Sequence, residues 1–229
     1  TNTNTGLTLT AGTLTGTVGS ILGTISNSGA ISLTGGGTFA GAISGTGTLA
    51  LSASAYTLTG ASSYTGTTTL ASGGGITYSS DASLGGSDAR LILSGTNTVA
   101  ASASLTNTHA LTVNGAISIG DAFTTTYSGV ISGAGTFTKG GSGELILSGH
   151  NSFTGAVTVS AGSLTLARND AIGGTTSLTL SSGTTLGVTT DLTSATAITT
   201  GTTGTITVAS GITFSSTGAT TINGTLTKA

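Results

Sequence analysis

Short runs of alternating apolar and hydroxyl residues, each closed by glycine, recur along this chain at a step near 20 residues. The stretch from Tyr127 to Leu166 shows the pattern most clearly, with runs such as ELILS, AVTVS and SLTL. Such alternation is typical of half-buried strands separated by tight turns. The apolar pairs that define the step are Leu91–Leu111, Leu93–Val113, Leu111–Ile131, Leu145–Leu164, Val157–Leu178, Leu166–Leu186 and Leu186–Ile206.

A step of this size restricts the fold, because one coil of about 20 residues cannot bury the apolar face of its own strands. Stacking the next coil in register satisfies the backbone groups through parallel pairing and continues the apolar interior. At about 4.8 Å per coil, about eleven coils would form a rod on the order of 50 Å long. The pattern therefore predicts an all-β fold, a parallel β-helix, also called a β-solenoid. Early strands are expected at Leu7–Leu9, Leu14–Val18 and Ile31–Leu33.

Other β architectures fit less well. A membrane barrel would need strands of about 10 residues and aromatic girdles, whereas this chain is 4% aromatic and has no Trp. Collagen needs glycine at every third position, and 40 glycines among 229 residues are about half that number. An antiparallel sandwich stays open as an alternative, although it does not explain the step near 20. No segment has the pattern of an amphipathic helix.

A longer repeat contains the short one. FAGAISGTGTL, which begins at Phe39, matches YSGVISGAGTF, which begins at Tyr127, at an offset of 88 residues. No linker interrupts the chain, so we expect a single continuous solenoid over residues 1–229. Its predicted parts are N-terminal coils (1–38), a degenerate copy (39–126), the best copy (127–212) and the start of a third copy (213–229). The segments around Asp81 and Asp170 are interpreted as two loops that leave the coil on the same side.

The low charge of the chain excludes several classes of function. Only 4% of residues are charged, and the first charge is Asp81, so the long uncharged span before it suggests that something covers part of the surface. Four Lys and Arg residues offer little attraction for nucleic acid. No apolar run reaches the roughly 20 residues of a membrane-spanning helix. The first residues, TNTNTGLTLT, contain no signal peptide, and we expect a mature or excised segment.

Residues suited to catalysis are few and scattered. Six acidic side chains are spread along the chain, and only Asp81 and Asp88 are close, where a solvated turn is favoured over a cation site. His109 and His150 lack the partners of a metal or catalytic motif and are interpreted as coil-surface residues. The runs GTGT and GAGT lack the GK[ST] of a phosphate loop. We therefore predict no catalytic, cofactor-binding or metal-binding residue, and no enzyme.

The best copy carries a specific resemblance. Over Gly133 to Leu164 the chain resembles the autotransporter-associated β-strand repeat, also called the passenger-associated transport repeat. The first copy is degenerate and lacks the Lys and the Asn of the motif. The residues that carry the resemblance are Gly133, Gly135, Lys139, Leu145, Leu147, Gly149, Asn151, Phe153, Gly155, Val159, Gly162 and Leu164.

The resemblance implies the passenger of a Gram-negative autotransporter, a right-handed β-helix displayed outside the outer membrane. Three functional hypotheses follow. The first is a surface-displayed structural solenoid, either an adhesin stalk or a matrix component of a biofilm, whose host or cell-surface ligand the sequence does not encode. The second is an extracellular fibre built by head-to-tail self-association. The third is an ice-binding solenoid, prompted by runs such as TNTNT and LTLT, against which stands the mixture of Thr with Ala, Ser and Gly at aligned positions.

Overall fold

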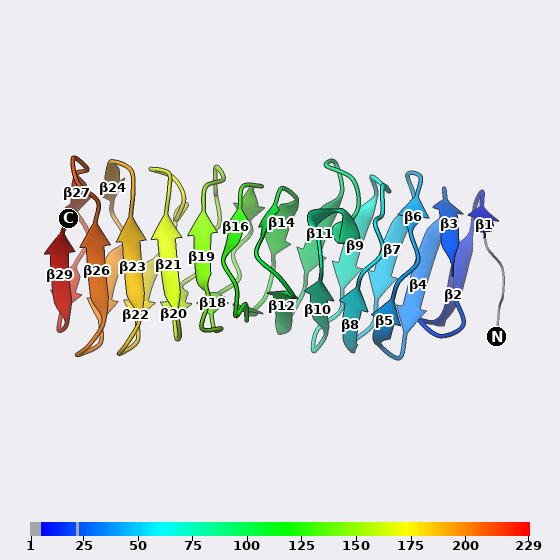
Figure 1. Cartoon of the computed structure of the whole chain (residues 1–229), viewed down its shortest axis with the longest axis horizontal. Helices are drawn as coiled ribbons and strands as arrows, with labels where there is room; N and C mark the ends of the chain where they lie inside the picture. Colours follow the sequence, from blue (N-terminus) through cyan, green and yellow to red (C-terminus); the bar gives the residue numbers. More distant parts are fainter. Residues whose placement is uncertain (1–5, 22) are drawn as a thin grey trace.

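The computed structural model describes residues 6–21 and 23–229. The TNTNT run at residues 1–5, which prompted the ice-binding hypothesis, lies outside the described residues. The described chain winds into one elongated stack of coils, from the N-terminal end at the right of Figure 1 to the C-terminal end at the left. All strand pairs are parallel. The predicted parallel β-helix is confirmed, whereas its right-handed sense stays a prediction.

Three faces surround the interior of the rod, and the chain visits them in a fixed order. The first face is a ten-stranded sheet. Its strands are β5 (Gly37–Phe39), β8 (Ala55–Leu58), β10 (Gly75–Tyr78), β12 (Asn97–Ala101), β15 (Ile117–Ile119), β18 (Phe137–Lys139), β20 (Val157–Val159), β22 (Ser177–Leu180), β25 (Ala197–Thr200) and β28 (Thr220–Ile222).

The second face follows the first in each coil and is made of two shorter sheets. The N-terminal sheet contains β1 (Gly6–Leu9), β3 (Thr24–Asn27) and β6 (Ile43–Ser44). The C-terminal sheet contains β13 (Leu105–Asn107), β16 (Thr125–Tyr127), β19 (Glu144–Leu147), β21 (Ser163–Leu166), β23 (Thr185–Val188), β26 (Thr205–Val208) and β29 (Thr225–Lys228). Between the two sheets lies the 3-10 helix η1 (Asp81–Leu84).

The third face closes each coil. Most of it is a seven-stranded sheet of β2 (Thr13–Thr17), β4 (Ala30–Thr34), β7 (Thr48–Leu51), β9 (Thr67–Leu70), β11 (Arg90–Leu93), β14 (Ala110–Val113) and β17 (Ile131–Ser132). Further along, β24 (Leu192–Ser194) pairs with β27 (Phe214–Ser216). The predicted early strands correspond to β1, β2 and β4.

Alternating side chains produce the interior. In β19, β21, β23 and β26 every second residue is buried, and Leu145, Leu164, Leu186 and Ile206 lie directly over one another in successive coils. Each fully buried aliphatic side chain of this kind contributes about 1.5–3 kcal/mol. Outward positions of the same strands carry mainly Ser, Thr and Gly. Like residues therefore stack on like residues in this part of the interior, which is a column of aliphatic groups.

The coil length varies around the predicted 20 residues. Thr13 pairs with Ala30, a step of 17, whereas Gly75 pairs with Thr98, a step of 23 across the segment that contains η1. The pairs predicted from the sequence are confirmed in the structure with one exception. The pair Leu166–Leu186 is wrong, because Leu166 pairs with Val188. The loop after β21 makes that coil 22 residues long.

The two copies of the long repeat lie on different faces. Phe39 ends β5 on the first face, while its counterpart Tyr127 ends β16 on the second. An offset of 88 residues thus covers four coils and one further face. For the same reason, the loop at Asp81 stands at the second face and the loop at Asp170 at the third, so the expectation that both leave on the same side is wrong. The division of the chain into copies stays a prediction.

Glycine marks the corners where the backbones of adjacent coils come closest. A Cβ on Gly155 would lie well inside van der Waals contact with the carbonyl oxygen of Gly135, and a Cβ on Gly135 would meet the carbonyl oxygen of Gly115 in the same way. Backbone atoms cannot move aside as the end of a side chain can. These corners therefore need glycine for space.

We expect Gly155→Ala to destabilise the fold by about 1–3 kcal/mol, because the added methyl group overpacks a rigid corner. Gly120→Ala is the matched control, since a Cβ there meets no atom within 4 Å, and it should stay within about 0.5 kcal/mol of the natural chain. Urea unfolding followed by circular dichroism measures both. Equal stability of the two variants would show that the corner contact does not limit coil stacking.

Candidate functional site

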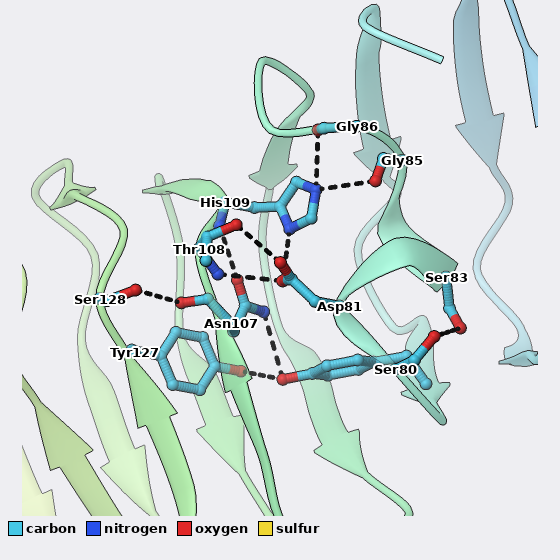
Figure 2. A network of polar contacts seen from close by, with 11 residues as sticks. Ser80, Asp81, Ser83, Gly85, Gly86, Asn107, Thr108, His109, Tyr127 and Ser128 are labelled. Carbon is cyan, nitrogen blue, oxygen red and sulfur yellow. Dashed lines mark hydrogen bonds and ion pairs between the residues drawn. The ribbon is translucent and has the colours of Figure 1, made fainter. Parts of the chain in front are cut away.

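The most connected polar cluster lies where η1 meets the strands of the second face. His109 follows β13 and is buried, with 3% of its side chain exposed. Its Nδ1 lies 2.9 Å from Oδ1 of Asp81, and its Nε2 lies 2.9 Å from the carbonyl oxygen of Gly86 and 3.3 Å from that of Gly85. Figure 2 shows the imidazole between these partners. The interpretation of His109 as a coil-surface residue is therefore wrong.

Asp81 fastens η1 to the next coil. Besides its contact with His109, its carboxylate accepts hydrogen bonds from the backbone N–H of Thr108 (2.9 Å) and from the hydroxyl of Thr108 (2.7 Å). The expected solvated turn holds for Asp88, which is exposed. Asp81 keeps 32% of its side chain exposed, and both of its carboxylate oxygens also have protein partners. Asp81 and His109 thus join the segment inserted after β10 to the next coil, while backbone hydrogen bonds from Ser62 N–H to the Ala82 carbonyl and from Gly86 N–H to the Tyr64 carbonyl join it to the coil before.

Two tyrosines extend the cluster into the interior. The hydroxyls of Tyr78 and Tyr127 lie 3.0 Å apart, and Nδ2 of Asn107 donates to the Tyr78 hydroxyl at 3.2 Å. Asn107 and Tyr127 are labelled in Figure 2. Burial raises the pKa of Tyr78 to about 12 and raises the pKa of Tyr127 well above its usual value. A tyrosine is protonated near neutral pH even without a shift, and the raised pKa values extend the protonated form of both phenols to higher pH. Both hydroxyls serve as hydrogen-bonding groups within the core.

The His109–Asp81 pair has the form of a general base with its orienting carboxylate. In a hydrolytic triad, however, the second ring nitrogen faces a nucleophile. Here Nε2 faces the carbonyl oxygens of Gly85 and Gly86 instead. The geometry makes this pair a structural lock for the inserted segment.

A second polar group occupies the corner between the first and second faces. Asp121 is fully buried, and its Oδ1 accepts a hydrogen bond from the backbone N–H of Ala101. Lys139, also fully buried, donates from Nζ to the carbonyl oxygens of Gly141 and Ala161.

Burial dominates the protonation of both corner charges. It raises the pKa of the Asp121 carboxyl, an effect opposed by the hydrogen bond from Ala101 and by the charge of Lys139. It lowers the pKa of the Lys139 ammonium, an effect opposed by the charge of Asp121. Attraction between the two groups only partly offsets the cost of removing them from water, as is usual for buried charges. The hydrogen bonds from Lys139 provide a partner for the carbonyl oxygens of Gly141 and Ala161, which lie in the turns at this corner.

Asn151 bridges three coils at a place where the third face has no strand. Its Oδ1 accepts a hydrogen bond from the backbone N–H of Ile131 at 2.8 Å, and its Nδ2 donates to the carbonyl oxygen of Ala171 at 2.6 Å. Ser62 makes the equivalent bridge in the degenerate copy. Its hydroxyl accepts a hydrogen bond from the N–H of Ile43, and its own N–H donates to the carbonyl oxygen of Ala82. The side chain replaces part of a missing strand ladder.

An exposed charged cluster lies beside this bridge. Nδ1 of His150 is 2.6 Å from Oδ2 of Asp170, and Nε of Arg168 is 2.8 Å from Oδ1 of the same carboxylate. The hydrogen bond from His150, followed by the charges of His150 and Arg168, lowers the pKa of Asp170. With 65% of its side chain exposed, His150 is confirmed as a coil-surface residue.

The remaining ionisable residues form no larger group. Within the described part of the chain, three or more His, Asp or Glu side chains nowhere gather closely enough to hold a metal ion. The same residues include no helix long and apolar enough to cross a membrane.

The residues that carry the repeat pattern all serve the winding of the coil. Phe153 of the pattern stacks on Phe137 in the interior, with ring centroids 6.0 Å apart. Gly133 and Gly162 have φ angles of 104° and 66°, which favour glycine. The apolar members Leu145, Leu147, Phe153, Val159 and Leu164 are buried. Gly135, Gly149 and Gly155 each approach a glycine carbonyl one coil earlier.

Residues 137–166 match the family model of the passenger-associated-transport repeat. The match confirms the resemblance seen in the sequence. It begins at Phe137 and ends at Leu166, so it includes Lys139 and Asn151, whereas Gly133 and Gly135 precede it. No curated protein and no solved structure matches the chain. In this chain the passenger-associated-transport repeat covers one coil and half of the next.

Some of these contacts could have been found from the sequence. His150 and Asp170 stand 20 residues apart, so the coil period alone pairs them. Asp81 and His109 stand 28 residues apart, because the coil between them contains the η1 insertion, and no sequence signal gives its length. Nothing in the sequence indicates that Tyr78 meets Tyr127, 49 residues away.

We expect Asn151→Ala to destabilise the chain by about 2–4 kcal/mol, because it leaves the buried N–H of Ile131 and the buried C=O of Ala171 unpaired. Asn151→Ser should cost less, since Ser62 makes the equivalent bridge in the degenerate copy. The exposed Asn114→Ala is the control and should be close to neutral. Urea unfolding gives the ranking, and a neutral Asn151→Ala would contradict the bridging role.

Asp121→Asn tests the corner charges. Because the folded pKa of Asp121 is raised, its contribution to stability is greatest at low pH and is lost as the pH rises through that value. We expect the variant to be more stable than the natural chain at pH 7. The difference should vanish below about pH 4, where the carboxyl is protonated in both states. A variant that is less stable at pH 7 would show that attraction to Lys139 outweighs the cost of burial.

Proposed function

We propose that this chain is a structural segment of an autotransporter-like passenger, a rigid stalk displayed on the surface of a Gram-negative bacterium. The observation that carries the proposal is the passenger-associated-transport repeat at residues 137–166, set within an unbroken stack of coils. Adhesion to a host or cell-surface ligand, or a place in an extracellular matrix, belongs to this proposal.

The polar clusters support a structural role. His109, Asp81, Asn107 and Asn151 direct their polar atoms to neighbouring coils. These contacts fix the stacking and leave no reactive atom of the four side chains directed at an open cleft. Their chemistry is that of a scaffold, and an adhesive activity would rest on outward side chains.

A second candidate is a head-to-tail fibre, in which the apolar side chains of the C-terminal coil would form the contact. Leu226 is 57% exposed and Ile222 is 38% exposed, and a shallow hollow of about 310 Å³ is lined by Val208, Ile212, Phe214 and Leu226 among others. Unpaired strand edges such as those of β28 and β29 template further strands. Either a next coil of the same polypeptide or the first coil of another copy would cover them.

Surface display is tested with antibodies raised against the purified segment. On intact cells of the bacterium that produces the protein, we expect antibody labelling and its loss after addition of external protease, while a periplasmic marker stays protected. Detection only after lysis would overturn the proposal. Electron microscopy of the purified segment separates the two candidates, since long uniform filaments favour the fibre and short rods favour the stalk.

A further inference from the structure

A single column of hydroxyl groups runs along the outward side of the ten-stranded sheet. Seven consecutive strands, from β12 to β28, carry Thr or Ser at the same register position. Within these seven strands only Ser118 departs from Thr, whereas the same register position holds Gly75 in β10 and Ala55 in β8, so the expected mixture of Thr with Ala, Ser and Gly holds for the sheet as a whole. We call it the hydroxyl ridge, and its members are Thr98, Ser118, Thr138, Thr158, Thr179, Thr199 and Thr221.

Small side chains border the hydroxyl ridge on both sides. Two residues before each member, from β15 to β28, stand Ala116, Thr136, Ala156, Ser177, Ala197 and Ala219. Two residues after it stand Gly120, Gly140, Ser160, Ser181, Gly201 and Asn223. None of these positions carries a charge, an aromatic ring or a long side chain. The face is therefore a row of hydroxyl side chains flanked by two columns of small, uncharged side chains, which we call the margins.

These properties fit one kind of partner. A hydroxyl both donates and accepts, so a row of hydroxyls is complementary to a second row like itself. The β-branched Thr side chains are stiff, so little rotamer entropy is lost on contact. An uncharged face brings no like charges together when it meets its own copy, and the margins leave room for a partner's ridge, as in interdigitated sheets.

From this geometry we propose that the hydroxyl ridge is a lateral contact face for a second copy of this chain. The two copies are related by a twofold axis, as in most homodimers, and run in opposite directions. The register with the greatest overlap places the central rung, Thr158, opposite its own counterpart. At the same time Thr138 lies level with Thr179 of the other copy. The two ridges run side by side, and each one packs over the margin next to its partner's ridge.

The size of the face sets the strength of the contact. Seven rungs at about 4.8 Å span on the order of 30 Å, and five residues of strand are about 15 Å wide. About 450 Å² per copy is below the roughly 800 Å² of a standard interface, so the association is weak and reversible. Many copies on one surface would strengthen it through effective concentration. Only this strengthening by many copies on one surface rests on the proposed function.

Single cysteines test the contact directly, because the chain contains none. Under mild oxidation we expect purified Thr158→Cys to form disulfide-linked dimers at least tenfold faster than Thr207→Cys, an outward position in β26 on the second face. A mixture of Thr138→Cys with Thr179→Cys should cross-link faster than either variant alone. Equal rates at Thr158 and Thr207 would indicate random collision and overturn the proposal.

Charge provides an independent measurement. Thr158→Lys places two ammonium groups opposite each other and should raise the dimer dissociation constant at least tenfold in sedimentation equilibrium, while Thr207→Lys leaves it unchanged. A species that stays monomeric up to millimolar concentration overturns the proposal. Open-ended polymers insensitive to Thr158→Lys would overturn it too and assign association to the coil ends. Thermal hysteresis that Thr158→Lys abolishes, without any dimer, would replace the second copy with ice as the partner of this face.

Discussion

Direct stacking of one backbone coil on the next is the constraint on which the rest of this structure depends. The coils meet through parallel strand pairing on three faces and through glycine corners, where a Cβ at Gly135 or Gly155 would collide with the carbonyl oxygen of the coil before. Each coil thus completes the hydrogen bonding of its neighbour and covers its apolar face. One coil alone can do neither, so the fold is cooperative along the rod.

Polar side chains stabilise the places where strand pairing is interrupted. Asn151 spans the gap in the third face, His109 and Asp81 hold the inserted η1 segment, and Lys139 reaches carbonyl oxygens at a turn. A buried polar group costs free energy unless it is paired. That cost is offset here because backbone groups of the same turns would otherwise be unpaired. Lys139 and Asn151, the two polar residues of the repeat motif with long side chains, therefore both have a structural role: each one pairs backbone groups of neighbouring turns.

The long repeat and the coil have different periods, and the difference affects what the rod presents. Similar segments such as those at Phe39 and Tyr127 lie on different faces, so a motif that recurs in sequence does not form a continuous stripe along the rod. The hydroxyl ridge arises differently, because it follows the coil period and stays on one sheet. Regular surfaces in this molecule therefore come from the coil step, whereas the repeat motif supplies corners and interior contacts.

The sequence alone determined the strands, the coil step and the family resemblance, because alternating apolar and hydroxyl residues and the glycines that end each run act over a few neighbouring residues. It also determined most of the inward pairs, such as Leu145 with Leu164. Only the tertiary structure decided the pairing of Leu166 with Val188, the burial of His109 and the contact of Tyr78 with Tyr127. The physical reason is that a coil can gain or lose residues at its turns without changing its strands. Each such change shifts which residues of later coils meet.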